Sequence, residues 1–224
     1  FRTFNMPEIG IEVLARIFKD RGYEEKGEYH FEKKKLFARH FEHQTPDLPL
    51  IFISELKVEE LSQPNRQIIH DLVAQTPQNF TRDPTFIMKG RPWNLSFNTY
   101  QQLKQESEYA AWMAAFGFRV NHFTVSVNQL KSFNDIRKVN QFLQDNGFAL
   151  NTSGGEVKGT AEQMLEQSST IAYNTKIRFS DGEHEIPACY YEFAKRYPKP
   201  NGQLFRGFIA GSADKIFEST DKGQ

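Results

Sequence analysis

The amino-acid sequence predicts an α+β protein made of two βαβββ modules that form a curled mixed sheet, with a mostly helical insertion between them. Two strand-and-helix units carry this prediction. The first begins with the strand-like run 1–5 and continues into an amphipathic helical pattern that ends at Gly22. The second repeats this order from residue 120 to Gly147. Extended, alternating runs follow each unit, as a βαβββ module requires.

The two units align at a nearly constant spacing. Asn5 and Asn128, which end the two opening strands, are 123 residues apart, and Gly22 and Gly147 are 125 apart. A middle offset of about 124 therefore relates the two copies. This shared offset indicates an internal repeat.

The first module is expected to span residues 1–56. Its segment 28–43 alternates aromatic and charged residues, and 48–56 is a compact apolar strand. Residues 57–118 are interpreted as an insertion that covers the sheet, with its better helices at 67–74 and 100–116. One face of the first module's own helix carries the apolar residues Ile9, Val13, Leu14, Ile17 and Phe18.

The second module is expected to span residues 119–224. We expect Ser132 to cap its helix. Strands are predicted at 170–179 and 185–194, joined by a hairpin turn at Asp181-Gly182. One face of the helix carries Phe133, Ile136, Val139 and Leu143.

Composition narrows the classes of protein. Lys and Arg number 28 and so do Asp and Glu, so the net charge is zero, which argues against nucleic acid or a membrane surface as a partner. No apolar run approaches the ~20 residues that a membrane span needs. Its one cysteine, Cys189, excludes an internal disulfide, so we expect a cytoplasmic protein. Because the chain begins within a strand-like run and without Met, we also expect an N-terminal segment to be missing.

Two side chains suggest a metal site. His122 lies in a β-type run that places it on one face with Thr124 and Ser126, and Glu192 lies in a second such run with Tyr190 on its face. Burying an imidazole and a carboxylate alone is costly, and metal coordination would offset that cost. The ordinary alternative is a hydrogen-bonded core histidine and an edge or ion-paired glutamate. The repeat offset places the counterpart of His122 three positions before Phe1.

Six short motifs in the right order resemble the 2-oxoadipate dioxygenase/decarboxylase family of the vicinal oxygen chelate superfamily, which is built from paired βαβββ modules. The resemblance runs along almost the whole chain. The motifs are Phe1-Arg2-Thr3-Phe4, Phe52-Ile53-Ser54-Glu55-Leu56, Arg119-Val120-Asn121-His122, Gln167-Ser168-Ser169-Thr170, Tyr191-Glu192-Phe193-Ala194-Lys195-Arg196 and Ala213-Asp214-Lys215-Ile216-Phe217-Glu218-Ser219-Thr220.

The resemblance implies an Fe(II) ion held by two histidines and a glutamate, which map to His122, Glu192 and a histidine three positions before Phe1. It also implies that Arg2 binds the substrate. Two imidazoles and one carboxylate leave about three coordination sites open, enough for a bidentate 2-oxo acid and dioxygen. The expected reaction is oxidative decarboxylation of a 2-oxo dicarboxylic acid such as 2-oxoadipate to 2-hydroxyglutarate, with a place in lysine catabolism.

Three further readings stay open. Glu55 lies in the last strand of the first module, so it is a lesser candidate for a fourth ligand beside the simpler role of a structural ion pair. The same fold supports isomerases and hydrolases of the glyoxalase type that use Zn²⁺ or Ni²⁺. A non-catalytic binding module is the third class. The remaining histidines have no matching partner spacing and are expected to be exposed or hydrogen-bonded.

Overall fold

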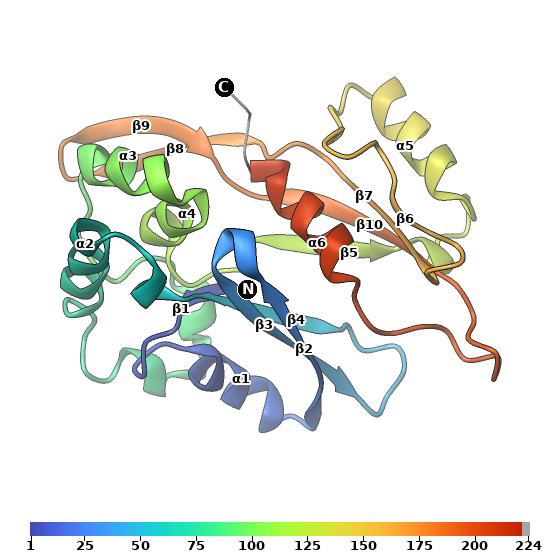
Figure 1. The fold of residues 1–224 in the computed structure, drawn as a ribbon, viewed down its shortest axis with the longest axis horizontal. Coiled ribbons are helices and arrows are strands. Elements are labelled where there is room, and N and C mark those ends of the chain that lie inside the picture. The colour runs from blue at the N-terminus through green and yellow to red at the C-terminus, as the bar shows by residue number, and fades with distance from the viewer. Residues whose placement is uncertain (221–224) are drawn as a thin grey trace. The chain divides into compact units, whose positions relative to one another are not determined.

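The computed structural model describes residues 1–220, and the chain separates into two compact units. The first unit comprises Phe1–Val120 and Thr175–Ile186, and the second comprises Asn121–Asn174 and Pro187–Gln224. Each unit contains a mixed four-stranded sheet together with helices (Figure 1). The predicted α+β class is therefore confirmed.

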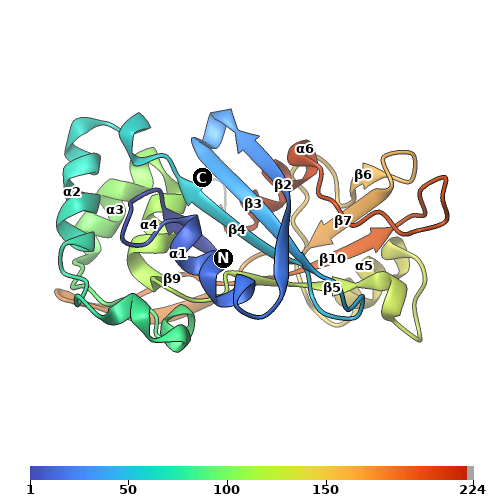
Figure 2. The same cartoon turned by 90° about the horizontal axis from the view of Figure 1, so that it is seen from below.

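The sheet of the first unit follows the expected strand–helix–strand–strand–strand order. It consists of β1 (Arg2–Phe4), β2 (Tyr23–Phe31), β3 (Leu36–His43) and β4 (Ile51–Leu56), arranged β1-β4-β3-β2. β1 pairs with β4 in parallel, and the other pairs are antiparallel. Helix α1 (Ile11–Lys19) packs its apolar residues against this sheet (Figure 2).

The insertion is mostly helical, as predicted, and it packs within the first unit. It contains α2 (Gln63–Val73), α3 (Phe97–Glu106) and α4 (Glu108–Phe116). The single helix expected at 100–116 is two helices, because the backbone is extended at Ser107. The Ser107 hydroxyl caps α4 by accepting a hydrogen bond from the Ala110 amide at 3.1 Å. Single 3-10 turns occur at Glu32–Lys34, Val58–Glu60, Phe80–Arg82, Pro84–Met88, Val127–Gln129 and Phe217–Thr220.

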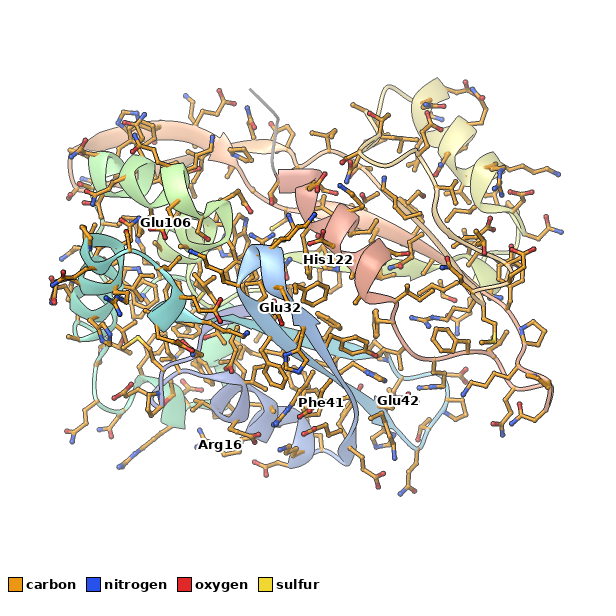
Figure 3. The ribbon with its side chains drawn as sticks, viewed as in Figure 1. Arg16, Glu32, Phe41, Glu42, Glu106 and His122 are labelled. Atoms are coloured by element: carbon orange, nitrogen blue, oxygen red, sulfur yellow. The ribbon has the colours of Figure 1, made fainter. Side chains whose placement is uncertain are left out.

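Aromatic side chains build much of the first unit's core, which agrees with the 21 Phe of the chain. The rings of Phe86 and Phe118 lie 5.2 Å apart, and Phe80 and Trp93 also pack against Phe118. Phe41 of β3, labelled in Figure 3, is fully buried in the same unit. Along the described residues 1–220, no helix is long and apolar enough to cross a membrane.

The second unit repeats the topology of the first. Its sheet consists of β5 (His122–Ser126), β6 (Lys158–Thr160), β7 (Leu165–Ser169) and β10 (Tyr190–Arg196), arranged β5-β10-β7-β6. β5 pairs with β10 in parallel, just as β1 pairs with β4. The strand order is therefore the same in both sheets, and the predicted internal repeat is confirmed.

The prediction of the second module's later strands was wrong in part. The turn at Asp181-Gly182 does join a hairpin, made of β8 (Asn174–Phe179) and β9 (Gly182–Pro187), but this hairpin forms a separate two-stranded sheet. It packs in the first unit, where the Asp181 carboxylate accepts from the Phe97 amide at 2.7 Å at the start of α3. The hairpin is therefore an excursion between β7 and β10.

One helix covers each face of the second sheet. Helix α5 (Ile136–Asp145) packs on the face of Val125 and Phe193. Its N-cap is Asp135, not the expected Ser132, because the Asp135 carboxylate accepts from the Arg137 amide at 2.7 Å. Helix α6 (Ala210–Ile216) contacts β6 and β7 and clusters with Tyr190, which points to the other face.

Candidate metal centre

The pairing of β5 with β10 brings the two predicted ligands together. His122 aligns with Tyr190, and Glu192 aligns with Thr124 two residues further along the pair. Because alternate side chains of a strand share a face, all four point to the same side of the sheet. The faces that strand parity predicted for His122 and Glu192 are therefore confirmed.

The donor atoms of the two residues lie within contact distance. His122 Nε2 is 3.1 Å from Glu192 Oε2, and the side chains are 15% and 4% exposed. His122 lies on β5 in the view of Figure 3. An imidazole nitrogen and a carboxylate oxygen that face each other at this depth present two adjacent ligands to a divalent cation.

Two neighbours fix the imidazole ring of His122. The ring stacks on Tyr190 with centroids 4.8 Å apart and planes inclined by 14°, and its Nδ1 lies 3.0 Å from Asn121 Nδ2. Since the ionised carboxylate of Glu192 can only accept, Nε2 carries the ring proton in this arrangement. If a metal binds Nε2, the ring proton must lie on Nδ1 instead. The Asn121 amide would then be flipped, so that its oxygen accepts a hydrogen bond from Nδ1.

The second carboxylate oxygen of Glu192 is also bound. Gln167 Nε2, on the neighbouring strand β7, donates to Glu192 Oε1 at 2.5 Å. Further along the same strand Ser169, which aligns with Glu192, shares a hydrogen bond of 2.7 Å with Ser219. Hydrogen-bonded polar side chains thus line this face of the sheet.

Lys158 of β6 extends that polar row and aligns with Gln167. Its ammonium group donates to the backbone carbonyl of Asn151, and the residue is only 3% exposed. Burial lowers the pKa of Lys158 to about 8, and the nearby carboxylates of Glu218 and Glu156 oppose this effect only in part. The amine therefore loses its proton at a lower pH than an exposed lysine.

Arg2 lies in the first unit, where its guanidinium is enclosed by helix α4. Nη1 is 3.4 Å from both carboxylate oxygens of Glu108, and the guanidinium carbon lies 4.9 Å and 5.0 Å from the ring centroids of Tyr109 and Trp112. Its side chain is 1% exposed. Such a buried, oriented guanidinium has the geometry that carboxylate recognition uses.

Glu55 performs a structural task. Its Oε2 accepts from the Ile11 amide at 2.9 Å, at the first turn of α1, where a carboxylate stabilises the helix N-terminus. Burial raises the pKa of Glu55, and the Ile11 hydrogen bond opposes that rise. The two roles considered for Glu55, a structural ion pair and a fourth ligand, stay predictions beside this helix contact.

The two registers also show which residue of β4 corresponds to Glu192. Ser54 of β4 pairs with Arg2 of β1. The repeat equivalent of Arg2, 124 positions on, is Ser126, which pairs with Ala194 of β10. Ser54 and Ala194 are therefore equivalent, and two residues earlier Phe52 is the equivalent of Glu192. The first module thus has a phenyl ring where the second has the carboxylate.

Two of the other histidines, His40 and His184, have specific local contacts. His40 is buried, with Tyr29 Oη at 2.9 Å from Nδ1 and Glu42 at 3.1 Å from Nε2. The ring of His184 stacks on Phe97 at 3.7 Å. Within residues 1–220, no group of three or more His, Cys, Asp or Glu side chains is placed to hold a metal ion. Among these residues, His122 and Glu192 are thus a pair of candidate ligands without a third.

Three contacts of this site were not anticipated from the sequence. Asn121, Gln167 and Tyr190 each lie in a motif or run that we identified, but no pattern showed that they touch the two candidate ligands. The contact of Gln167 depends on the pairing of β7 with β10, and β7 was not among the predicted strands. A correct assignment of Leu165–Ser169 as a strand, together with its register against β10, would have placed Gln167 on the same face as Glu192.

A family model described as 2-oxoadipate dioxygenase/decarboxylase matches residues 1–89 and 85–203 of the chain. A curated relative from Oryza sativa subsp. japonica, named 2-oxoadipate dioxygenase/decarboxylase, chloroplastic/amyloplastic, is 39% identical over all of this chain and 68% of its own length. Its Arabidopsis thaliana counterpart, named chloroplastic, is 37% identical over all of this chain and 67% of its own length.

Solved structures agree with these matches. The hydroxyglutarate synthase of Oryza sativa in complex with 2-oxoadipate is 37% identical, with a TM-score of 0.93 over 99% of this chain and 79% of that one. A Shewanella frigidimarina NCIMB 400 protein that carries a hydrolase name is 54% identical, with a TM-score of 0.90 over 93% of this chain and 82% of that one. A glyoxalase superfamily protein of Ralstonia eutropha JMP134 is 20% identical and shares the fold, with a TM-score of 0.80 over 94% of this chain and 73% of that one.

The expected cytoplasmic location is corrected by these relatives. Both curated relatives are named as chloroplast proteins, the rice one also as an amyloplast protein. The presence of a single cysteine was the physical basis of the expectation. It bears on disulfide formation and does not distinguish one reducing compartment from another.

Proposed function

The chain belongs to the 2-oxoadipate dioxygenase/decarboxylase family, and from this premise we propose that it oxidatively decarboxylates a 2-oxo dicarboxylic acid such as 2-oxoadipate at an Fe(II) ion. His122 and Glu192 are the proposed ligands within the chain. The observation that carries the proposal is the approach of His122 Nε2 to Glu192 Oε2 at 3.1 Å on a buried sheet face. The family and the rice structure with 2-oxoadipate support the substrate class.

The donor set fits this ion. Two histidines and one carboxylate form the facial arrangement typical of non-haem Fe(II) oxygenases. His122 and Glu192 supply two of these donors, and the repeat offset together with the family motif supports a histidine three positions before Phe1 as the third. When bound, the iron supplies the redox chemistry that joins dioxygen to the 2-oxo acid.

The chain's own groups prepare this chemistry. Tyr190 and Asn121 hold the His122 ring in one orientation, so that little ordering is needed when a metal binds. We propose that Arg2 binds the distal carboxylate of the substrate, which its charge and its buried, fixed guanidinium suit. A dicarboxylic acid would then be preferred over a monocarboxylic acid of equal length.

Oxygen uptake by the full-length protein tests the proposal. After anaerobic reconstitution with Fe(II), addition of 2-oxoadipate and dioxygen is expected to consume one dioxygen and to release one carbon dioxide for each 2-hydroxyglutarate formed. His122→Ala should abolish turnover. His43→Ala is the matched control, because this histidine accepts from the Thr45 amide in the first unit and should be dispensable.

A different result would identify another activity. The hydrolase name of the Shewanella protein and the shared glyoxalase-type fold favour Zn²⁺ or Ni²⁺ acting as a Lewis acid as the second candidate. Bound zinc in the purified protein, with no oxygen uptake after iron reconstitution, would reject the dioxygenase. Metal analysis and oxygen consumption on one preparation therefore separate the two.

A further inference from the structure

Gln167 is the buried amide beside the proposed ligand Glu192. It lies on β7, aligns with Ala194 of β10, and is 2% exposed. Its Nε2 donates to Glu192 Oε1 at 2.5 Å, while Glu192 Oε2 faces His122. The two oxygens of one carboxylate therefore have different partners.

The orientation of the Gln167 amide follows from its neighbour. An ionised carboxylate accepts hydrogen bonds and donates none, so the amide must turn its NH₂ group toward Glu192. Its own oxygen, Oε1, then points away from that carboxylate, and it has no hydrogen-bond partner among residues 1–220. A buried amide oxygen without a donor costs free energy, so it is a position at which a donor is expected.

This arrangement decides how Glu192 can bind a metal. Each oxygen accepts one hydrogen bond, Oε1 from Gln167 and Oε2 from the His122 ring. A metal at His122 Nε2 displaces the ring proton from that nitrogen and so vacates Oε2, whereas Oε1 keeps its Gln167 donor. A carboxylate that binds through one oxygen takes one coordination site, whereas one that binds through both takes two. A facial set of three single-atom ligands leaves about three coordination sites open, and a chelating 2-oxo acid and dioxygen together fill them. If Glu192 bound through both oxygens, one of these sites would be lost.

We propose that Gln167 is a positioning residue that restricts Glu192 to binding through Oε2 alone. This inference rests on the proposed function, since it concerns the same metal. The Nε2 group of Gln167 keeps Glu192 Oε1 out of the coordination sphere. When the metal is bound, Gln167 Oε1 accepts a hydrogen bond from a donor in the site, such as a water ligand of the ion. Gln167 thus keeps one coordination site free without touching the metal itself.

The test compares Gln167→Met, which preserves length and removes both hydrogen-bonding groups, with the wild-type protein. Both are prepared metal-free at full length and titrated with Mn(II) alone, and the free ion is measured by electron paramagnetic resonance. Loss of an outer-shell partner is expected to weaken binding by about 10–100-fold. The visible spectrum of bound Co(II), which depends on coordination number, should also differ between the two.

Ser168→Ala is the matched control. Ser168 is the next residue of β7, is fully buried, and donates to Asn140 Oδ1 at 2.6 Å on the opposite face. Its loss removes a buried hydrogen bond from the same strand and should leave both the Mn(II) affinity and the Co(II) spectrum unchanged. Gln167→Asn, which keeps an amide but shortens its reach, serves as a second variant should Gln167→Met not fold.

Three outcomes decide the matter. Weaker Mn(II) binding and an altered Co(II) spectrum in the Gln167 variants, but not in Ser168→Ala, support the inference. Unchanged affinity and spectrum in a folded Gln167 variant reject it while the proposed metal site stands. A wild-type protein that binds neither ion overturns the proposed function, and the inference falls with it.

Discussion

Replacement of Glu192 by glutamine separates metal binding from packing. The side chain is 4% exposed and accepts hydrogen bonds from Gln167 at 2.5 Å and, with the ring proton on Nε2, from His122 at 3.1 Å. Glutamine has nearly the same volume and retains a carbonyl oxygen that Gln167 can still reach. The change therefore removes the charge and one metal-binding oxygen while the strand stays packed.

The two effects differ in size. Hydrogen bonds to charged groups contribute ~1.5–3 kcal/mol and neutral ones ~0.5–1.5 kcal/mol, so two weakened bonds lower the metal-free stability of the second unit by about 2 kcal/mol. Glutamine also avoids the cost of burying a charge, so this is an upper value. A metal at about 1,000 times its Kd stabilises the wild-type protein by ~4 kcal/mol, and the variant should lose this increment.

Hydrogen exchange of the β5 and β10 amides is the suitable measurement. Both tryptophans, Trp93 and Trp112, lie in the first unit, so their fluorescence does not report directly on the second. Exchange is measured with and without the metal for the wild-type protein, Glu192→Gln and Glu166→Gln. Glu166 is the control, because it is also buried and hydrogen-bonded, to Arg137 and Tyr197, but lies on the opposite face. Equal metal-induced protection in Glu192→Gln and the wild-type protein would refute the assignment.

Three further predictions follow from buried charge and backbone geometry. Arg2→Ala should raise KM for dicarboxylic more than for monocarboxylic 2-oxo acids, by about 10–100-fold, as expected for one lost charged contact; equal changes would show that Arg2 does not bind the distal carboxylate. Because burial lowers the pKa of Lys158 from 10.5 to about 8, wild-type stability should rise between these pH values and Lys158→Met should flatten that rise in denaturant titrations; an undiminished rise would assign it elsewhere. Gly22→Ala and Gly147→Ala should each cost ~1–2 kcal/mol because φ is +84° and +83°. The cost should be larger at Gly22, where the new Cβ would lie 2.9 Å from His43 Nε2, and equal losses in thermal unfolding would contradict this.

The repeat was predictable because its markers are local. Gly22 and Gly147 both adopt a left-handed conformation directly after their helices, a geometry that favours glycine and therefore leaves a trace in the sequence. Strand parity correctly grouped His122 with Thr124 and Glu192 with Tyr190, because the two-residue period of a strand holds in any sheet. These groupings needed no knowledge of long-range pairing, whereas bringing His122 and Glu192 to one face depends on the pairing of β5 with β10.

The middle strands of the second module were not predictable in the same way. All five residues of Leu165–Ser169 are buried, yet four are polar, so the segment shows neither apolar alternation nor an apolar run. The strong turn signal at Asp181-Gly182 belongs to the excursion instead. Since Gln167 lies on the missed strand, its contact with Glu192 was hidden as well.

The β8-β9 hairpin gives the chain an interleaved connectivity. The backbone passes between the units at 120/121, 174/175 and 186/187, so residues 1–120 lack the first unit's hairpin, while residues 121–224 contain the whole second unit together with that hairpin. Proteolytic nicking near residue 174 would leave β7 on one fragment and β10 on the other, and their antiparallel pairing would keep the fragments associated. Separating the units would therefore require a linker in place of the hairpin in the second unit, because a cut at 120/121 leaves the first unit's hairpin on the other fragment.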